Sequence, residues 1–271
     1  MSRFLSIVIL LIGLGLPQLG FAASHEPASR SPNFVRSAGK ATIRGRWVSR
    51  EGATYVVTHG MGGTRSGDRF ERLASELEKA YPGANVLRVD WTPAATLQAF
   101  GLPSPWKVAA EIDGVALELA QQLQEAGVDR TKLTMIGESF GNWVNAKAAE
   151  KLEGVHCLLA FNPASELAGY ALPDLREWSD VAWSFHTRSC YDTVQPIADR
   201  GLFLSTRPKA TATVQHTSGI HWLADRIAAG DSRWLRCEMK LPTADANHFD
   251  AVAGLEGELI AEQPMRVEEK G

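Results

Sequence analysis

The pattern that most constrains the fold is an alternation of apolar, strand-forming runs with amphipathic helical periods. Six runs are typical of buried β-strands: TYVVTHG, NVLRVDW, KLTMIGE, VHCLLAFN, VAWSFHT and GLFLST. Four helical periods lie between several of them or after the last: DRFERLASELEKAY, WKVAAEIDGVALELAQQLQEAG, GNWVNAKAAEKLE and SGIHWLADRIAAG. In the second period, apolar residues recur at helix spacing from Val108 to Leu123. The pattern predicts an α/β fold with a mostly parallel central sheet and helices on both faces.

The 271 residues suit one domain with a further segment at each end. Residues 1–22 combine an arginine, a short apolar run and small residues, which predicts a cleaved signal peptide. This apolar run is too short to span a bilayer comfortably, so we expect no stable membrane anchor and a secreted or periplasmic protein. We expect a polar lead-in over residues 23–50 that ends in a short strand, an α/β domain over 51–260, and a flexible acidic tail over 261–271.

Charge and cysteine content narrow the partners and the compartment. The net charge of -3 gives no basic surface of the kind that binds nucleic acid or anionic lipid. In an oxidising compartment, two of the three cysteines can form a disulfide. Cys157 lies in an apolar run and is predicted to be a buried strand residue. Cys190 and Cys237 lie near segment ends, so our hypothesis pairs these two.

The pentapeptide GESFG, residues 137–141, lies where a strand run meets a helical period. In a G-x-S-x-G pattern the glycines let the chain turn sharply from strand to helix, which lifts the serine Oγ out of the sheet. The N-terminal amides of the following helix favour negative charge at that point. We therefore interpret Ser139 as a nucleophile; the alternative is a serine in a tight turn without activity.

A glycine-rich loop, HGMGGT, follows the first of the six strand runs. Glycines let backbone N–H groups approach a ligand closely, and an acyl-transfer site needs two such donors for its oxyanion. The N–H groups of Met61 and Phe140 are the predicted pair. A phosphate-binding loop is the alternative, but no Lys-Ser or Lys-Thr follows the glycines. His59 is interpreted as a support beneath this loop rather than as a base.

A general base is expected among the histidines that follow the last strand run. His216 comes soon after GLFLST and just before a helical period. His221 lies within that period, where a packing histidine is the ordinary expectation. His248 follows an irregular segment and stays open as an alternative on these grounds alone.

The third member of a triad orients the imidazole and stabilises its charged form. Asp192 follows the VAWSFHT run by a few residues and is the candidate. Its alternative role is the N-cap of a short helix. The preceding strand run ends in Asn162, whose amide can hydrogen-bond a neutral ring but cannot stabilise an imidazolium as a carboxylate does.

Together, these segments resemble the pancreatic and lipoprotein lipase family of α/β-hydrolases, from about Tyr55 to Cys237. VVTHGMGG resembles the family's oxyanion loop, VLRVDW its next strand, and TMIGESFGNWVNAKAAEKL its nucleophile elbow. FNPASELAGY resembles the segment of the catalytic aspartate, and VQHTSGIHWLADRIAAGDSRWLRC that of the catalytic histidine, which selects His216 over His248. The resemblance implies the α/β-hydrolase fold and a triad chemistry that needs no metal and no organic cofactor.

Three departures from the family change what we expect. Glu138 stands where the family usually has histidine, which is a mild change. Asn162 stands where it has the catalytic aspartate, and loss of that carboxylate lowers turnover by a factor on the order of 10⁴. We therefore expect the acid at Asp192, where most α/β-hydrolases have it. The short connection RPKATATVQ replaces a long lid, and the family's C-terminal β-sandwich domain is not found.

These features predict an exported serine hydrolase that acts on carboxylic esters, with a small-molecule or lipid ester as its partner. The lidless site implies an esterase or phospholipase A1 rather than a triglyceride lipase. A second hypothesis, favoured by Asn162, is a catalytically impaired hydrolase fold that binds lipid or protein. A peptidase or amidase would use the same triad.

Overall fold

A computed structural model gives the structure of most of the predicted domain. The residues that it describes are 34–63, 69–99, 102–164, 173–187, 198–204, 212–236 and 250–252. Several predictions concern residues outside these ranges, namely the signal peptide, the acidic tail, Asp192, His248, Cys190 and Cys237.

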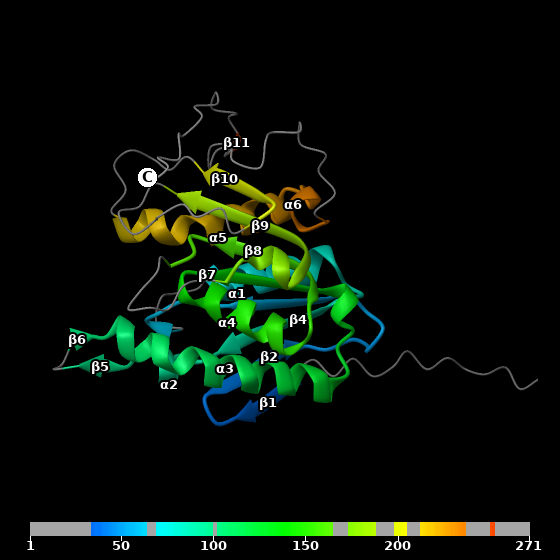
Figure 1. Cartoon of the computed structure of the whole chain (residues 1–271). Helices are drawn as coiled ribbons and strands as arrows, with labels where there is room; N and C mark the ends of the chain where they lie inside the picture. Colours follow the sequence, from blue (N-terminus) through cyan, green and yellow to red (C-terminus); the bar gives the residue numbers. More distant parts are fainter. Residues whose placement is uncertain are drawn as a thin grey trace, which may run out of the picture.

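Nine of the described strands form one large sheet in the order β1-β2-β4-β3-β7-β8-β9-β10-β11 (Figure 1). Their bounds are β1 Phe34–Ala38, β2 Ala41–Arg46, β3 Thr54–Thr58, β4 Asn85–Asp90, β7 Leu133–Glu138, β8 Val155–Phe161, β9 Ser179–Thr187, β10 Arg200–Leu204 and β11 Asp250–Val252. Every pairing from β4 to β11 is parallel, whereas β1 and β2 are antiparallel to their neighbours. In a parallel sheet the carboxyl ends of the strands share one edge, and loops at that edge form the site.

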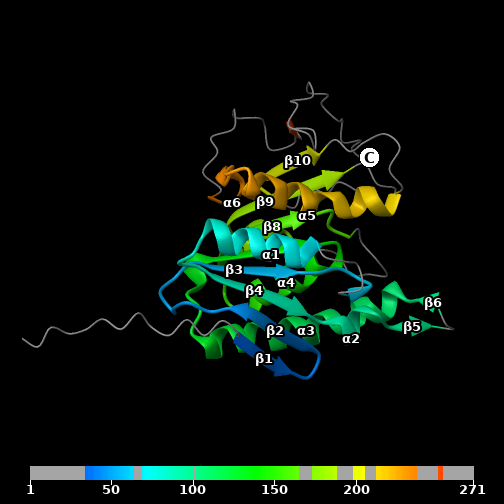
Figure 2. The ribbon, with the colours of Figure 1, turned by 180° about the vertical axis from the view of Figure 1, so that it is seen from behind.

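Helices cover both faces of this sheet. α3 (Pro105–Ala126) and α4 (Phe140–Lys151) pack on one face, and α1 (Arg69–Ala80) and α5 (Ala212–Ala228), seen in front in Figure 2, pack on the other. The shorter elements are α2 Thr92–Ala95, α6 Arg233–Arg236, the hairpin of β5 Gln98–Ala99 and β6 Leu102–Pro103, and the 3₁₀ turns Arg130–Lys132 and Leu175–Glu177. Among the described helices, none is both long and apolar enough to cross a membrane.

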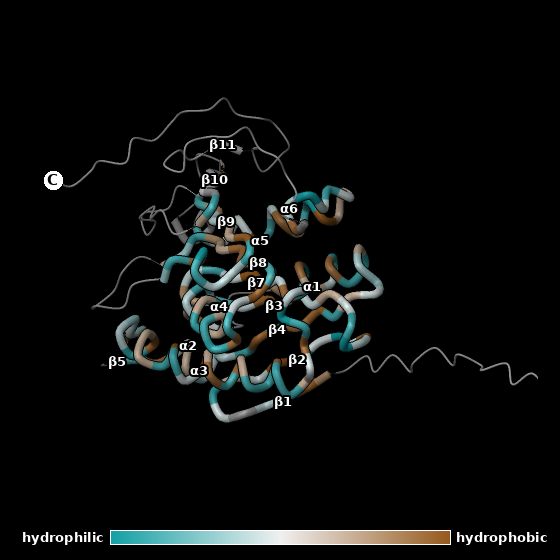
Figure 3. The backbone as a smooth tube through the Cα atoms, turned by 45° about the vertical axis from the view of Figure 1, so that its right-hand side comes forward, coloured by the Kyte–Doolittle hydropathy of each residue, from teal (hydrophilic) through white to brown (hydrophobic). Residues whose placement is uncertain are grey.

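Burial of both faces explains why the central strands read as continuous apolar runs. Neighbouring residues of a strand point to opposite faces. Val56 and Met135 belong to the core under α3 and α4, whereas Val57 and Ile136 belong to the core under α1 and α5. The brown segments of the tube in Figure 3 accordingly concentrate in the central strands, and much of the helical surface is teal or pale.

The predicted α/β architecture is confirmed. The six expected strands are β3, β4, β7, β8, β9 and β10, and the four expected helices are α1, α3, α4 and α5. The segment 23–50 differs from the expected lead-in with one short strand, because β1 and β2 both lie in it and both join the sheet. The sheet therefore begins before residue 51. These strands lie at one edge of the sheet and alternate polar with apolar residues, which makes them harder to recognise.

Candidate active site

Ser139 lies at the sharp turn between β7 and α4, with φ 52° and ψ -125°. A non-glycine residue rarely adopts a positive φ, and such strain is typical of functional sites. The flanking glycines allow the turn, because a Cβ on Gly141 would lie 2.5 Å from the carbonyl oxygen of Thr58. A Cβ on Gly137 would lie 2.6 Å from Oδ1 of Asn142. α4 therefore begins in direct contact with the end of β3, as the G-x-S-x-G pattern predicts.

Hydrogen bonds fasten this turn to the neighbouring strand β8. The backbone N–H of Ser139 donates to the carbonyl of Phe161 at 3.0 Å. The buried Asn142 side chain donates from Nδ2 to the carbonyl of Ser139 at 3.1 Å and to that of Phe161 at 2.9 Å. Sequence reasoning did not single out Asn142, although an amide in the first turn after G-x-S-x-G is a signal for such a contact.

The predicted oxyanion loop lies against Ser139. A Cβ on Gly60 would lie 2.8 Å from Cβ of Ser139, so only a glycine lets the loop approach this closely. The N–H of Gly62 donates to the carbonyl of Ala95 at 2.9 Å, which holds the loop on α2. The backbone N–H groups of Met61 and Phe140 donate to no backbone carbonyl of another described residue. An oxyanion hole requires two backbone donors that can reach the carbonyl oxygen of a substrate.

His59 lies buried beneath this loop. Its Nδ1 is 2.8 Å from the carbonyl oxygen of Gly60, and its Nε2 is 3.3 Å from the backbone nitrogen of Trp91. The imidazole stacks on the Trp91 indole at 5.6 Å, and the indole N–H donates to the carbonyl of His59. These contacts make His59 a support of the loop, as expected.

His59 also affects the ionisation of Asp90. Contact with His59, together with Thr92 and Arg44, holds the pKa of Asp90 well below its usual range despite burial.

The sequence suggested that His216 lies just before a helix, but His216 lies inside α5. The helix begins at Ala212, because the residues that precede His216 continue the helical period. The close approach of Gly219 to Phe161, where a Cβ would lie 2.8 Å from Cδ1, places this end of α5 over the end of β8. His216 is therefore near the strand to which the Ser139 turn is hydrogen-bonded. His221, farther along α5, is exposed.

Asn162 is fully buried at the end of β8, with φ 42°. Its Nδ2 donates to the backbone carbonyl of His216 at 2.6 Å, and its Oδ1 accepts from the backbone N–H of Thr187 at 2.6 Å. Both polar atoms of the amide thus engage backbone groups of neighbouring segments. Thr187 is the last residue of β9, so the candidate acid Asp192 follows it closely in sequence, outside the described residues.

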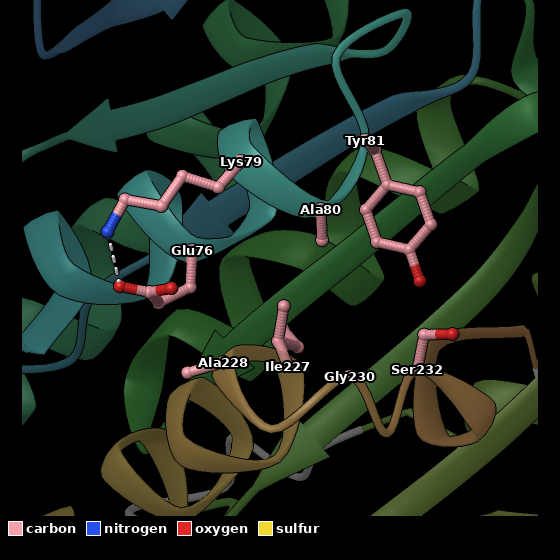
Figure 4. Close-up of a pocket in the computed structure, with 8 residues that line it drawn as sticks. All are labelled: Glu76, Lys79, Ala80, Tyr81, Ile227, Ala228, Gly230 and Ser232. Atoms are coloured by element: carbon pink, nitrogen blue, oxygen red, sulfur yellow. Dashed lines mark hydrogen bonds and ion pairs between the residues drawn. The ribbon is translucent and has the colours of Figure 1, made fainter.

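Away from Ser139, the described residues form a hollow between α1 and the end of α5. The hollow is lined by Glu76, Lys79, Ala80, Tyr81, Ile227, Ala228, Gly230 and Ser232 (Figure 4). It lies at the ends of two helices that run back from the site edge, so it is remote from Ser139. In the described part of the chain, no group of three or more His, Cys, Asp or Glu side chains is arranged to hold a metal ion.

Comparison with known proteins identifies the fold. No protein-family model and no curated protein matches the chain. A predicted CIB-like hydrolase from Thermoplasma acidophilum is similar with a TM-score of 0.51 and 14% identity, over 76% of this chain and 97% of that chain. Est1E from Butyrivibrio proteoclasticus gives 0.47 and 13%, over 76% of this chain and 100% of that chain. Dienelactone hydrolase from Anabaena variabilis gives 0.46 and 18%, over 74% and 96%.

The chain therefore has the α/β-hydrolase fold, and this prediction is confirmed. The likeness shows this fold and does not single out the pancreatic and lipoprotein lipases. The narrower resemblance, the triad and the substrate remain proposals.

Proposed function

We propose that the chain is a serine hydrolase that cleaves carboxylic esters. Ser139 Oγ attacks the ester carbonyl, and His216 accepts the hydroxyl proton. The oxyanion that forms is stabilised by the N–H groups of Met61 and Phe140. His216 then returns the proton to the departing alcohol, and water releases the acyl group by the same route. Asp192 is the proposed acid, which orients His216 and stabilises its charged form.

One observation carries this proposal: Ser139 is strained and lies directly against a glycine-containing loop. Ser139 has φ 52°, and the loop backbone at Gly60 packs directly on its Cβ. A serine in an ordinary turn needs neither the strain nor so close an approach of a second backbone segment. Their combination is expected for a nucleophile whose reaction develops negative charge on a carbonyl oxygen.

The contacts of Asn162 support Asp192 as the acid. Both polar atoms of the Asn162 side chain bind backbone groups, one of them the carbonyl of His216 rather than its ring. An amide engaged in this way holds the backbone and is not required to orient the imidazole.

We further propose that the substrate is a lipid or acyl ester and that the protein is exported. The first proposal rests on the resemblance to the pancreatic and lipoprotein lipase family, and the second on the N-terminal signal peptide. The short connection between β10 and α5 supports an open site without interfacial activation. A panel of p-nitrophenyl esters from acetate to palmitate tests the preferred chain length. Hydrolysis of a peptide or amide in preference to every ester would contradict the proposal.

Labelling with a fluorophosphonate tests the nucleophile directly. We expect labelling of the wild type that is absent in Ser139→Ala, with a loss of ester turnover on the order of 10⁵ or more. Ser37→Ala, which changes an exposed serine of β1, is the control and keeps full labelling. An unlabelled and inactive wild type would favour the alternative, a hydrolase fold that binds lipid or protein without catalysis.

A further inference from the structure

A buried ion pair joins the residue before Ser139 to the first residue of α1. Glu138 is 2% exposed and Arg69 is 5% exposed. Nε and Nη2 of Arg69 donate to Oε2 of Glu138 at 2.9 and 2.8 Å. Glu138 shares its face of β7 with Ile136, which places it under α1 and α5. Neither residue belongs to the proposed triad or to the oxyanion donors.

Stability alone is a weak reason for such a pair. Removing two charges from water is unfavourable, and apolar residues of similar volume often make a core equally or more stable. The pair does restrict how its two segments are oriented relative to each other, because a planar guanidinium that makes two hydrogen bonds to one carboxylate accepts few orientations.

The pair holds the start of α1 on the Ser139 turn. The segment that carries Met61 follows the end of β3 at Thr58, and it rests on Ser139 through Gly60. Arg69, the first residue of α1, is held on Glu138. Gly60 and Arg69 thus both contact the two-residue step from Glu138 to Ser139.

Phe70 connects the ion pair to the residues beneath Gly60. Cζ of Arg69 lies 4.7 Å from the centre of the Phe70 ring, and the same ring meets His59 edge-on at 6.3 Å. His59 in turn contacts the carbonyl of Gly60. The ion pair is therefore continuous, through packed rings, with the support beneath the oxyanion loop.

We propose that the Arg69–Glu138 ion pair is a positioning device for the oxyanion hole, an inference that rests on the proposed function of Ser139. The two donors come from different segments, Met61 from the loop and Phe140 from α4. An oxyanion must lie about 2.7–3.1 Å from both donors to be stabilised, so the docking of the loop on β7 sets the strength of the site. A misplacement of about 1 Å at such a site lowers the rate by a factor on the order of 10².

The test is the rate at which a fluorophosphonate modifies Ser139, which requires no knowledge of the natural substrate. In that reaction Ser139 Oγ bonds to phosphorus, fluoride leaves, and His216 takes the hydroxyl proton, while the phosphoryl oxygen occupies the oxyanion hole. The principal variant is Arg69→Met with Glu138→Leu, which removes both charges and preserves the packed volume. We expect a melting temperature at or above that of the wild type and a labelling rate lower by about 10- to 100-fold.

Steady-state kinetics with p-nitrophenyl acetate separate positioning from general damage. We expect kcat of the double variant to fall with the labelling rate, while KM stays within about twofold, because the lost interaction acts in the transition state. Glu138→Gln, which keeps the shape and one acceptor, should lose part of kcat and provides the same test if the double variant is unstable. Arg69→Lys, which keeps the charge, should recover part of the rate lost in an Arg69→Met single variant.

The matched control is a second ion pair of α1. Arg72 pairs with Asp225 of α5, and both side chains are largely exposed. Arg72→Met with Asp225→Leu removes one charge from α1 and one from α5 without touching the Ser139 turn, and should label at the wild-type rate.

The positioning role would be overturned if the Arg69–Glu138 double variant were labelled at the wild-type rate. It would also be overturned if the Arg72–Asp225 control lost labelling rate by the same factor. These outcomes differ from failure of the proposed function, in which the wild type itself is not labelled at Ser139.

Discussion

The side-chain amide of Asn162 bridges the two segments that flank the proposed base and acid. It donates to the carbonyl of His216 and accepts from the N–H of Thr187, each at 2.6 Å. His216 is 54 residues from Asn162 in sequence, and Thr187 is 25. One buried side chain thus holds the start of α5 against the end of β9. The Asn162 side chain therefore holds two backbone segments together.

Replacing Asn162 should therefore loosen the site rather than remove its acid. Asn162→Gly loses both side-chain bonds but tolerates the positive φ, so we expect the free energy of unfolding to fall by about 1–3 kcal/mol. Turnover of p-nitrophenyl acetate should fall by about tenfold or less. Urea denaturation and initial rates check the two values. Asn162→Ala adds strain at φ 42°, and should be the less stable of the two variants.

Asp192→Asn should affect turnover far more than stability. Loss of the carboxylate leaves His216 without its charged partner, and we expect kcat to fall on the order of 10⁴. The pH–rate profile should change as well, since the basicity of the imidazole depends on that partner. The assignment is wrong if Asp192→Ala leaves ester hydrolysis unchanged while Asn162→Ala abolishes it.

Gly141→Ala should prevent α4 from docking on β3. The added Cβ would lie 2.5 Å from the carbonyl oxygen of Thr58 and 2.6 Å from that of His59, and neither backbone group can move easily. Such overpacking destabilises a protein by about 1–3 kcal/mol or more. Thermal unfolding measures the effect. Gly83→Ala is the control, because a Cβ there meets nothing within 4 Å.

The sequence reveals the strands and the nucleophile turn because both have local signatures. Strands such as β7 are buried on both faces and read as apolar runs, and G-x-S-x-G requires glycines at close backbone contacts. β2, which lies next to the edge strand β1, alternates buried and more exposed residues and lacks such a run. The partners of Asn162 and of Glu138 lie far away in sequence, Arg69 being 69 residues before Glu138. The contacts between residues so far apart in the chain cannot be predicted from a single sequence.

Acidification should weaken the support of the oxyanion loop through Asp90. His59, then Thr92 and Arg44, lower the pKa of Asp90 below its ordinary value of 3.8. A lowered pKa in the folded state means that the ionised group stabilises the fold above about pH 3.8 and that this contribution is lost as the pH falls further. Asp90→Asn should thus be less stable than the wild type at pH 7, by on the order of 1 kcal/mol.

The difference between wild type and Asp90→Asn should shrink in urea denaturation at about pH 3. Asp113→Asn, which changes an exposed carboxylate of α3, controls for the loss of one negative charge. A stability difference that is equal at pH 7 and pH 3 would contradict the role given to Asp90.

Ser139→Gly should produce an inactive protein that is more stable than Ser139→Ala. At φ 52° and ψ -125° any residue with a Cβ is strained, and such strain amounts to about 1–3 kcal/mol. Glycine relieves it, although its greater freedom in the unfolded chain offsets up to about 1 kcal/mol. We expect a net gain of about 1 kcal/mol over Ser139→Ala in urea denaturation, while neither variant reacts with a fluorophosphonate. Equal stability of the two variants would mean that the strain at Ser139 is no larger than this offset of about 1 kcal/mol.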